Sequence, residues 1–272
     1  MIFEKMSFKE YKELDAINYS TLKYMAESPL AYIHNKDNPR PETPALYIGR
    51  AVHKRVLEPD GFNSEFAIFE GERRAGPDWK AFLSSHANKT ILKMAEMDEV
   101  VDMTFAVTKS KWYAEFFKDG RPEVAFTWMD KETGLTCKGR ADMLLGKALV
   151  GLKTARSVIP REFQSDGARM LYHLQWGMYE EGLLANGVEI EKVVEVAVRK
   201  KAPHDVAVFS IGEHTLTVGR NIFHSLLQRV SECRMTDAWP GVAPEPVDFH
   251  LPAWADSSDM TTITMDGEEV EL

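Results

Sequence analysis

The feature that most constrains the fold is a run of three strand patterns in the middle of the chain. Glu123–Met129 alternates and contains Val, Phe, Thr and Trp, which is typical of a strand. A turn at residues 131–134 precedes a second strand pattern, Leu135–Leu144, and Gly146-Lys147 separates that pattern from a third, Ala148–Lys153. Strands joined by turns this short predict a β-meander at the centre of the fold.

Helical patterns surround the meander. Before it we expect a helix that Asn18 or Ser20 caps and that ends before Pro29, a second from about Ala45 to Pro59, and two more within residues 90–118, with loops at 35–44 and 71–80. After it we expect a long helix over Gly167–Ala185, strands at Val193–Arg199 and Val206–Ile211, and a last helix from about Thr215 to Cys233. This order predicts an α/β fold with a central mixed β-sheet flanked by helices and a helical N-terminal region.

Composition narrows the class of protein. The 14 Phe, 8 Tyr and 6 Trp can build a large core, which excludes a disordered chain. No apolar run approaches the roughly 20 residues of a membrane span, and the charged N-terminus is unlike a signal peptide. The two cysteines, Cys137 and Cys233, are too few for a disulfide scaffold or a cysteine-based zinc site. We expect a cytoplasmic protein with no membrane partner.

The acidic net charge of −9 is unevenly distributed. Residues 256–272 carry six acidic side chains and no Lys or Arg, so we divide the chain into one domain at 1–255 and an acidic C-terminal tail at 256–272. Local basic patches, rather than net charge, hold phosphates. Such clusters occur at Arg50, Lys54 and Arg55; Arg73 and Arg74; Lys138 and Arg140; Lys153 and Arg156; and residues 199–201. Any one cluster alone is most simply a solvated face.

Two charged side chains near the ends of neighbouring strands form the central candidate site. Asp142 lies near the end of the second strand and Lys153 near the end of the third, and hairpin geometry brings such positions to one sheet edge. A carboxylate there can hold Mg²⁺ through oxygen ligands. A lysine beside it can orient a metal-bound water or help to deprotonate it. An Asp and a Lys at this spacing are, by themselves, more often structural than catalytic.

Other candidates become informative through their order along the chain. A G-x-A-x-H segment ends at His53, Glu123 lies on the first strand, and Gln175 and Tyr179 share one helix face because they are four residues apart. Each has an ordinary explanation on its own: a packed or surface histidine, and a helix face that combines core packing with a surface amide.

In this order the motifs resemble those of the PD-(D/E)XK nuclease superfamily, and more narrowly those of the RecE, or exonuclease VIII, family of phage and prophage recombination exonucleases. The similarity covers nearly the whole chain. Its segments are INYSTLKYMAESPLAYIHNKD, LYIGRAVHKRVLEPDGF, GLTCKGRADML, LVGLKTA, YHLQWGMY, and TDAWP with LPAWA.

The resemblance implies a role for each matching residue. Asp142 corresponds to the first metal aspartate and His53 to an additional metal-ligating histidine. Lys153 corresponds to the lysine of the D-x-K or E-x-K triplet. Gln175 and Tyr179 correspond to helix residues that steady the site and the substrate.

The resemblance also implies an activity. Such enzymes use Mg²⁺, with Mn²⁺ as an alternative, to degrade double-stranded DNA from its ends in the 5′-to-3′ direction. They leave a 3′ single strand for a single-strand annealing recombinase of RecT type, and their ring-shaped homo-oligomers enclose DNA. A bacterial host and a phage or prophage origin follow from the same resemblance. Candidate DNA contacts are Arg73, Arg74, Arg140 and Arg156, because guanidinium groups match phosphate oxygens.

One position departs from the family pattern. The acid expected two residues before Lys153 is replaced by Gly151, which has no side chain to bind a metal. Losing a principal catalytic group commonly costs a factor of roughly 10² to 10⁴. Three explanations stay open: an engineered inactivating substitution, a degenerate paralogue, or another acid, such as Glu123, in its place. If Gly151 is simply a missing ligand, Gly151→Asp is expected to raise activity.

Two rival hypotheses follow from the same residues. A non-catalytic protein that binds DNA ends would keep the nuclease fold, and Gly151 favours it. A nuclease with an iron–sulfur cluster would need four cysteines, whereas this chain has two.

Overall fold

A mixed six-stranded sheet forms the centre of the molecule, with strand order β1-β4-β5-β6-β7-β8. The computed structural model describes residues 1–3, 6–252, 262–265 and 268–271. The strands of this sheet are β1 (Ile2–Phe3), β4 (Arg121–Met129), β5 (Thr136–Leu145), β6 (Ala148–Ala155), β7 (Lys192–Arg199) and β8 (Val206–Ile211). Neighbouring strands are antiparallel except for β6 and β7, which are parallel. The predicted meander is therefore β4–β5–β6.

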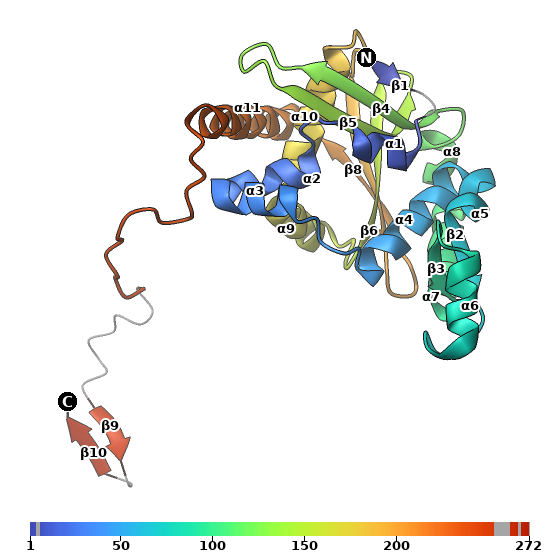
Figure 1. Ribbon diagram of the computed structural model, residues 1–272, viewed down its shortest axis with the longest axis horizontal. Helices are drawn as coiled ribbons and strands as arrows, with labels where there is room; N and C mark the ends of the chain where they lie inside the picture. Colours follow the sequence, from blue (N-terminus) through green and yellow to red (C-terminus); the bar gives the residue numbers. More distant parts are fainter. Residues whose placement is uncertain (4–5, 253–261, 266–267, 272) are drawn as a thin grey trace.

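Helices cover both faces of the sheet (Figure 1). The helices and 3₁₀ turns are α1 (Phe8–Glu13), α2 (Tyr19–Leu22), η1 (Lys23–Ala26), α3 (Pro29–Asp37), α4 (Pro44–Leu57), η2 (Pro59–Gly61), α5 (Phe62–Glu65), α6 (Gly76–Ser85), α7 (Met94–Lys109), α8 (Lys111–Phe116), α9 (Pro160–Arg169), α10 (Tyr172–Leu184) and α11 (Glu213–Thr236). A separate parallel pair joins β2 (Phe66–Phe69) to β3 (Thr90–Lys93). The predicted α/β architecture with a helical N-terminal region is confirmed.

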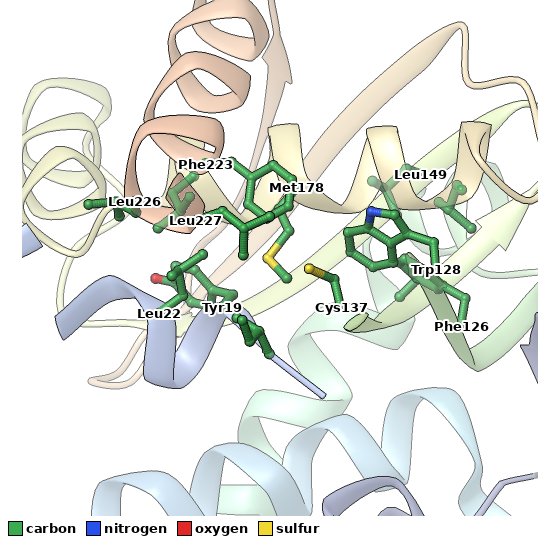
Figure 2. Close-up of a cluster of buried hydrophobic side chains, with 14 of the residues drawn as sticks. Tyr19, Leu22, Phe126, Trp128, Cys137, Leu149, Met178, Phe223, Leu226 and Leu227 are labelled. Carbon is green, nitrogen blue, oxygen red and sulfur yellow. The ribbon is translucent and has the colours of Figure 1, made fainter. Parts of the chain in front are cut away.

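One face of the sheet packs against α10, α11 and the N-terminal helices. Figure 2 shows this core, where Phe126, Trp128 and Leu149 of the sheet lie near Met178 of α10 and Phe223 of α11. Burial of such side chains is worth about 1.5–3 kcal/mol each. The two helices approach closely because glycines face each other. A Cβ at Gly177 would lie 2.7 Å from the backbone carbon of Gly219.

The opposite face packs against α4 and α7. Val52 and Val56 of α4 and Val100 and Met103 of α7 are buried with apolar side chains of β6 and β7. The strands are apolar on both faces because helices cover both. Charged residues on the inner strands are therefore exceptions that need an explanation.

Several boundaries differ from the sequence expectation. Residues 167–185 are not one helix: α9 and α10 are separate, because Leu171 adopts a left-handed backbone conformation with φ 58°. Residues 71–80 are not all loop, since α6 begins at Gly76. The expected loop at 35–44 is shorter, because Pro29 starts α3 rather than only ending the preceding helix, a role that proline fills well at a first helical position.

One local expectation, the helix cap at Asn18, is confirmed. Asn18 caps α2 by accepting a hydrogen bond from the Thr21 amide. Both cysteines are buried and free. No helix in the described part of the chain is long and apolar enough to cross a membrane.

Of the acidic tail, Thr262–Met265 and Glu268–Glu271 pair as β9 and β10, whereas the division expected at residue 255 lies outside the described residues.

Candidate metal-dependent nuclease site

Asp142 is the residue around which the site is built. It lies on β5, and its Oδ2 accepts a hydrogen bond of 2.8 Å from the backbone amide of Leu152 on β6. The next residue on that strand is Lys153. The β5–β6 hairpin thus brings Asp142 and Lys153 together, and both line one small cavity.

His53 and Glu123 lie on one side of Asp142. His53 comes from α4, and its Nδ1 lies 3.7 Å from Asp142 Oδ1. Ligand atoms of His53, Glu123 and Asp142 all lie within 4.8 Å of one another. Burial is the main cause that lowers the pKa of His53, although Asp142 opposes it. The ring is therefore neutral at neutral pH, which is the form that can bind a metal ion.

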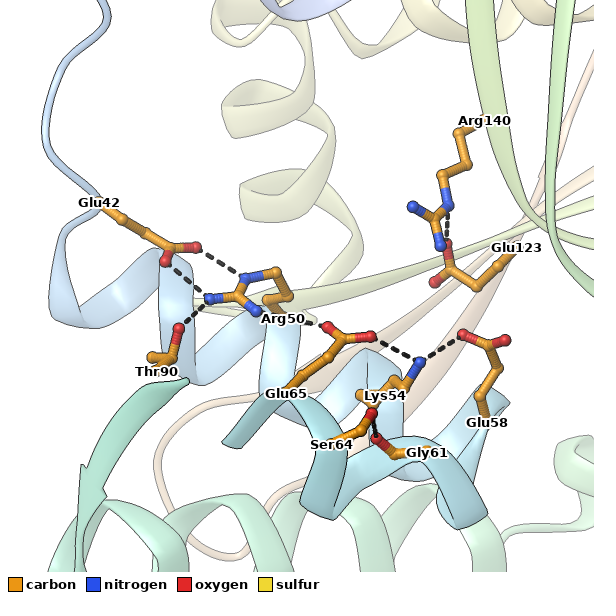
Figure 3. A network of polar contacts seen from close by, with 10 residues as sticks. All are labelled: Glu42, Arg50, Lys54, Glu58, Gly61, Ser64, Glu65, Thr90, Glu123 and Arg140. Carbon is orange, nitrogen blue, oxygen red and sulfur yellow. Dashed lines mark hydrogen bonds and ion pairs between the residues drawn. The ribbon is translucent and has the colours of Figure 1, made fainter. Parts of the chain in front are cut away.

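Glu123 is held in an unusual position by its backbone and by Arg140. Its φ of 52° is uncommon for a residue other than glycine. Figure 3 shows its carboxylate directed at the Arg140 guanidinium, and Arg140 Nε lies 2.5 Å from Glu123 Oε2. Burial raises the pKa of Glu123 to about 7; Asp142 and Glu58 act in the same direction and Arg140 against it. Arg140 thus belongs to the interior of the site, with only 11% of its side chain exposed.

Helix α10 closes the other side of Asp142. Gln175, Trp176 and Tyr179 line the same cavity as Asp142 and Lys153. Tyr179 is fixed by an edge-on contact with Phe126 of β4, with ring centroids 5.6 Å apart. The cavity measures about 20 Å³, which is room for about one water-sized group.

A further acid, Glu195 on β7, lines this cavity and was not anticipated from the sequence. Its side chain is 1% exposed. Oε2 accepts a hydrogen bond of 2.8 Å from Trp176 Nε1, and Oε1 lies 3.6 Å from Lys153 Nζ. The available signal was a single acid within the otherwise apolar strand interior of KVVEVAVR.

Glu195 occupies the space beside Gly151. The two residues are Cα partners in the parallel β6–β7 ladder. A Cβ at Gly151 would lie 2.6 Å from Glu195 Oε2 and 2.7 Å from Cδ, which is too close for any real contact. The expectation that Gly151→Asp fills an empty position is therefore revised, because the carboxylate of Glu195 is already there.

Lys153 lies between carboxylates and aromatic rings. Burial lowers its pKa, but Glu195 and Asp142 raise it more, so the net shift is upward and the ammonium is charged at neutral pH. Its Nζ also lies 5.5 Å from the centroid of the Tyr172 ring. A fixed cation at this point suits the stabilisation of negative charge on a phosphate or on an attacking water.

The other predicted DNA contacts have different surroundings. Arg74 is held by Tyr47 Oη at 3.0 Å, the Ile91 carbonyl at 3.0 Å and Glu96 at 2.6 Å, so it joins α4, β3 and α7. It is a structural residue as well as a candidate contact. Arg73 is exposed. Arg156 follows β6 closely after Lys153, has 68% of its side chain exposed and pairs with Asp166 at 3.2 Å.

The residues of the site fit a divalent cation. Carboxylate oxygens suit Mg²⁺ and Mn²⁺, and an imidazole among them is compatible with Mn²⁺ and other transition metals. Glu195 Oε1 is buried without a hydrogen-bond partner in the described residues, and it forms an ion pair of 3.6 Å with Lys153 Nζ. His53, Glu123 and Asp142 would hold such an ion.

A family model described as a PDDEXK-like domain of unknown function matches residues 18–247. The chain belongs to this family. The predicted relationship to PD-(D/E)XK nucleases is thereby confirmed, and the match is consistent with a RecE-like member. No curated protein matches the sequence.

One solved structure supports the fold of this PDDEXK-like protein. A candidate exonuclease from Eubacterium rectale is 14% identical, with a TM-score of 0.65 over 94% of this chain and 99% of its own. At this identity the likeness concerns the fold alone. A phage-related exonuclease from Haemophilus somnus is 11% identical and covers 82% of this chain and 96% of its own, but its TM-score of 0.36 is too low to carry an argument.

Proposed function

We propose that this PDDEXK-like protein is a metal-dependent exonuclease that degrades double-stranded DNA from its ends, 5′ to 3′, and leaves 3′ single-stranded overhangs. Mg²⁺ is the proposed cofactor, and Mn²⁺ is expected to replace it. The substrate class, the direction and the ion rest on the sequence resemblance to the RecE family.

The observation that carries the proposal is the convergence on Asp142. His53 and Glu123 approach it from one side, and Lys153, Gln175 and Tyr179 share a cavity with it on the other. Paired metal-binding groups beside a fixed cation are what phosphodiester hydrolysis needs, because negative charge develops on the phosphate in the transition state.

A divalent cation bound at Asp142 would neutralise this charge and lower the pKa of a coordinated water. The protein's own side chains orient the water and position the phosphate. The Lys153 ammonium donates a hydrogen bond to the attacking water or to a phosphate oxygen, while Gln175 and Tyr179 limit where the phosphate can lie. The water oxygen bonds to phosphorus, the bond from phosphorus to the leaving nucleotide oxygen breaks, and that oxygen gains a proton while the water loses one.

DNA would approach along the end of β6, where Arg156 is exposed beyond Lys153. Arg73 is a second proposed contact, and Arg74 and Arg140 are less accessible because they are engaged with Glu96 and Glu123. A ring-shaped homo-oligomer and a RecT-like annealing partner in a bacterial cytoplasm complete the proposal, on the resemblance alone.

Digestion of matched linear and covalently closed circular duplexes tests the proposal. With Mg²⁺, a linear duplex labelled at the 5′ end is expected to release its label early, a 3′ label is expected to persist, and closed circles are expected to survive. Cutting of circles at a rate similar to linear DNA would indicate an endonuclease instead. Loss of the 3′ label first would reverse the proposed direction.

The second candidate function is a non-catalytic protein that binds DNA ends, which Gly151 favours because the family's acid is missing there. A binding measurement beside the digestion separates the two. Tight binding of duplex ends with no release of label, in Mg²⁺ or in Mn²⁺, would establish this alternative.

A further inference from the structure

Glu195 is a buried acid in a strand whose neighbours are apolar. Val194 and Val196 on either side of it point into the α4–α7 core, and Glu195 points to the face that α10 covers. Burying an ionised carboxylate costs several kcal/mol unless it is paired or holds a metal. A side chain kept in such a place therefore requires a compensating interaction.

The protein partners of Glu195 account for only part of this compensation. Trp176 Nε1 satisfies Oε2. Oε1 has no hydrogen-bond partner among the described residues, and the nearest cation, Lys153 Nζ, is 3.6 Å away. This oxygen therefore has an ion pair with Lys153 but no hydrogen bond, and it lies at a buried point beside the cavity.

The location of this carboxylate is where the family's missing acid would be. An acid at position 151 would project from β6 to the same face as Lys153, because side chains two residues apart on a strand share a face. That space is filled by the Glu195 carboxylate, which reaches it from the next strand. Asp142, Lys153 and Glu195 line one cavity there, as an acid from β6 would.

We infer that Glu195 supplies, from β7, the metal-binding carboxylate that position 151 lacks. Asp142 would be shared between this carboxylate and the His53–Glu123 side of the site. The inference deepens the proposed function and rests on it for the role of the ion in cleavage. It also makes the chain a complete enzyme rather than an inactivated one. The competing role is structural: Glu195 would only neutralise and position Lys153.

Metal titration without DNA separates the two roles. Calorimetric titration of the full chain with Mn²⁺ is compared for the unmodified protein, Glu195→Gln and Glu191→Gln. Glu191 is an exposed acid just before β7, so its variant removes the same charge outside the site. We expect Glu195→Gln to weaken Mn²⁺ binding by at least about tenfold and Glu191→Gln to leave it unchanged. Equal affinity in Glu195→Gln and the unmodified protein would overturn the inference, as would absence of Mn²⁺ binding by the unmodified protein.

A second pair of variants, in which the carboxylate is moved from position 195 to position 151, tests the inference if Glu195→Gln fails to fold. Glu195→Ala empties the space, and Gly151→Asp combined with Glu195→Ala returns an acid to it from β6. The double variant is expected to recover at least about tenfold in Mn²⁺ affinity over Glu195→Ala, with Mg²⁺-dependent digestion of linear duplex recovering in parallel. No recovery of Mn²⁺ affinity would contradict the inference.

The two proposals fail separately. If Mn²⁺ binds through Glu195 but linear duplex is never digested, the proposed nuclease function is wrong and the metal-binding role of Glu195 stands. If duplex is digested at the same rate in Glu195→Gln as in the unmodified protein, and Mn²⁺ affinity is also equal, the nuclease function stands and Glu195 is not a ligand.

Discussion

Two clusters in the described part of the chain combine one histidine with two acids, and they have different surroundings. The first is His53 with Glu123 and Asp142; the second is His224 with Asp130 and Glu181. In the second, His224 Nε2 lies 2.9 Å from Glu181 Oε2, and Asp130 Oδ2 accepts hydrogen bonds from the amide and hydroxyl of Thr133 at 2.8 and 2.7 Å. These groups largely satisfy one another and fasten the β4–β5 turn to α10 and α11.

The first cluster adjoins groups that are not satisfied in this way. Asp142 shares a cavity with the buried Lys153 and with Glu195, whose Oε1 has no hydrogen bond within the described residues and only an ion pair of 3.6 Å with the lysine. The comparison teaches that the kinds of ligand do not distinguish the two clusters, whereas charged groups buried beside a cavity do, and such groups make the first cluster the better candidate for a functional site.

The largest expected difference is between the two aspartates. Asp142→Asn is expected to lower Mg²⁺-dependent digestion of linear duplex by a factor of about 10² or more, because a principal metal carboxylate is lost. Asp130→Asn removes the same charge from the second cluster and is expected to change the rate by less than about threefold. Similar losses in the two variants would remove the functional distinction between the clusters.

Substitution of the two histidines, His53 and His224, compares the same two clusters, with smaller expected effects than substitution of the aspartates. His53→Gln is expected to weaken Mn²⁺ binding by about tenfold, because one ligand is lost while others remain. His224→Gln is expected to leave Mn²⁺ affinity unchanged and to lower stability by about 0.5–1.5 kcal/mol through its lost contact with Glu181. Calorimetric titration and urea unfolding measure the two effects. A weaker Mn²⁺ affinity in His224→Gln would place the ion in the second cluster.

A substitution at Gly151 tests whether the space next to the first cluster is filled by the Glu195 carboxylate. With Glu195 intact, Gly151→Asp is expected to destabilise the protein by about 1–3 kcal/mol, since the new side chain overlaps a carboxylate of the same charge. Thermal unfolding measures the change in stability. Gly187→Asp is not a suitable control, because Gly187 has φ 77° and a substitution there is strained. Gly241→Asp is the better control, because the nearest atom to a Cβ there is Leu30 Cδ2 at 3.8 Å, an ordinary contact distance. Equal stability of Gly151→Asp and the unmodified protein would mean that Glu195 can leave this space without cost.

The smallest expected effect lies outside both clusters. Arg156→Ala is expected to weaken duplex binding by about three- to tenfold and to reduce the salt dependence by about one phosphate contact. Lys147, which pairs with Glu189 and Glu191 before the other end of β6, provides the control, because Lys147→Ala is expected to leave DNA affinity unchanged. Fluorescence anisotropy at several salt concentrations measures both. Equal effects would mean that β6 does not set the direction from which DNA approaches.

The sequence predicts the meander well because alternation and short turns determine β4, β5 and β6 locally. The pairing of Asp142 with Lys153 follows from the same hairpin. The break between α9 and α10 was not predictable, because Leu171 takes a left-handed conformation with neither Gly nor Pro at that position. Glu195 was missed for a longer-range reason: its partner Gly151 is set by the register of two parallel strands that a helical crossover joins.

The sequence around Arg73 and Arg74 is uninformative for a similar reason. Their polar loop gives no sign that Arg74 reaches Tyr47 and Glu96, which lie far from it in sequence. Roles that depend on strand register or on contacts between distant helices become visible only once the fold is known.

Anomalous X-ray scattering from crystals of the full chain soaked in Mn²⁺ tests the central claim most directly. The account predicts an Mn²⁺ peak at the carboxylate of Asp142, with Glu195 as one of the oxygen ligands in the cavity beside Gly151. A peak confined to Asp130, Glu181 and His224, or the absence of any peak at Asp142, would contradict it.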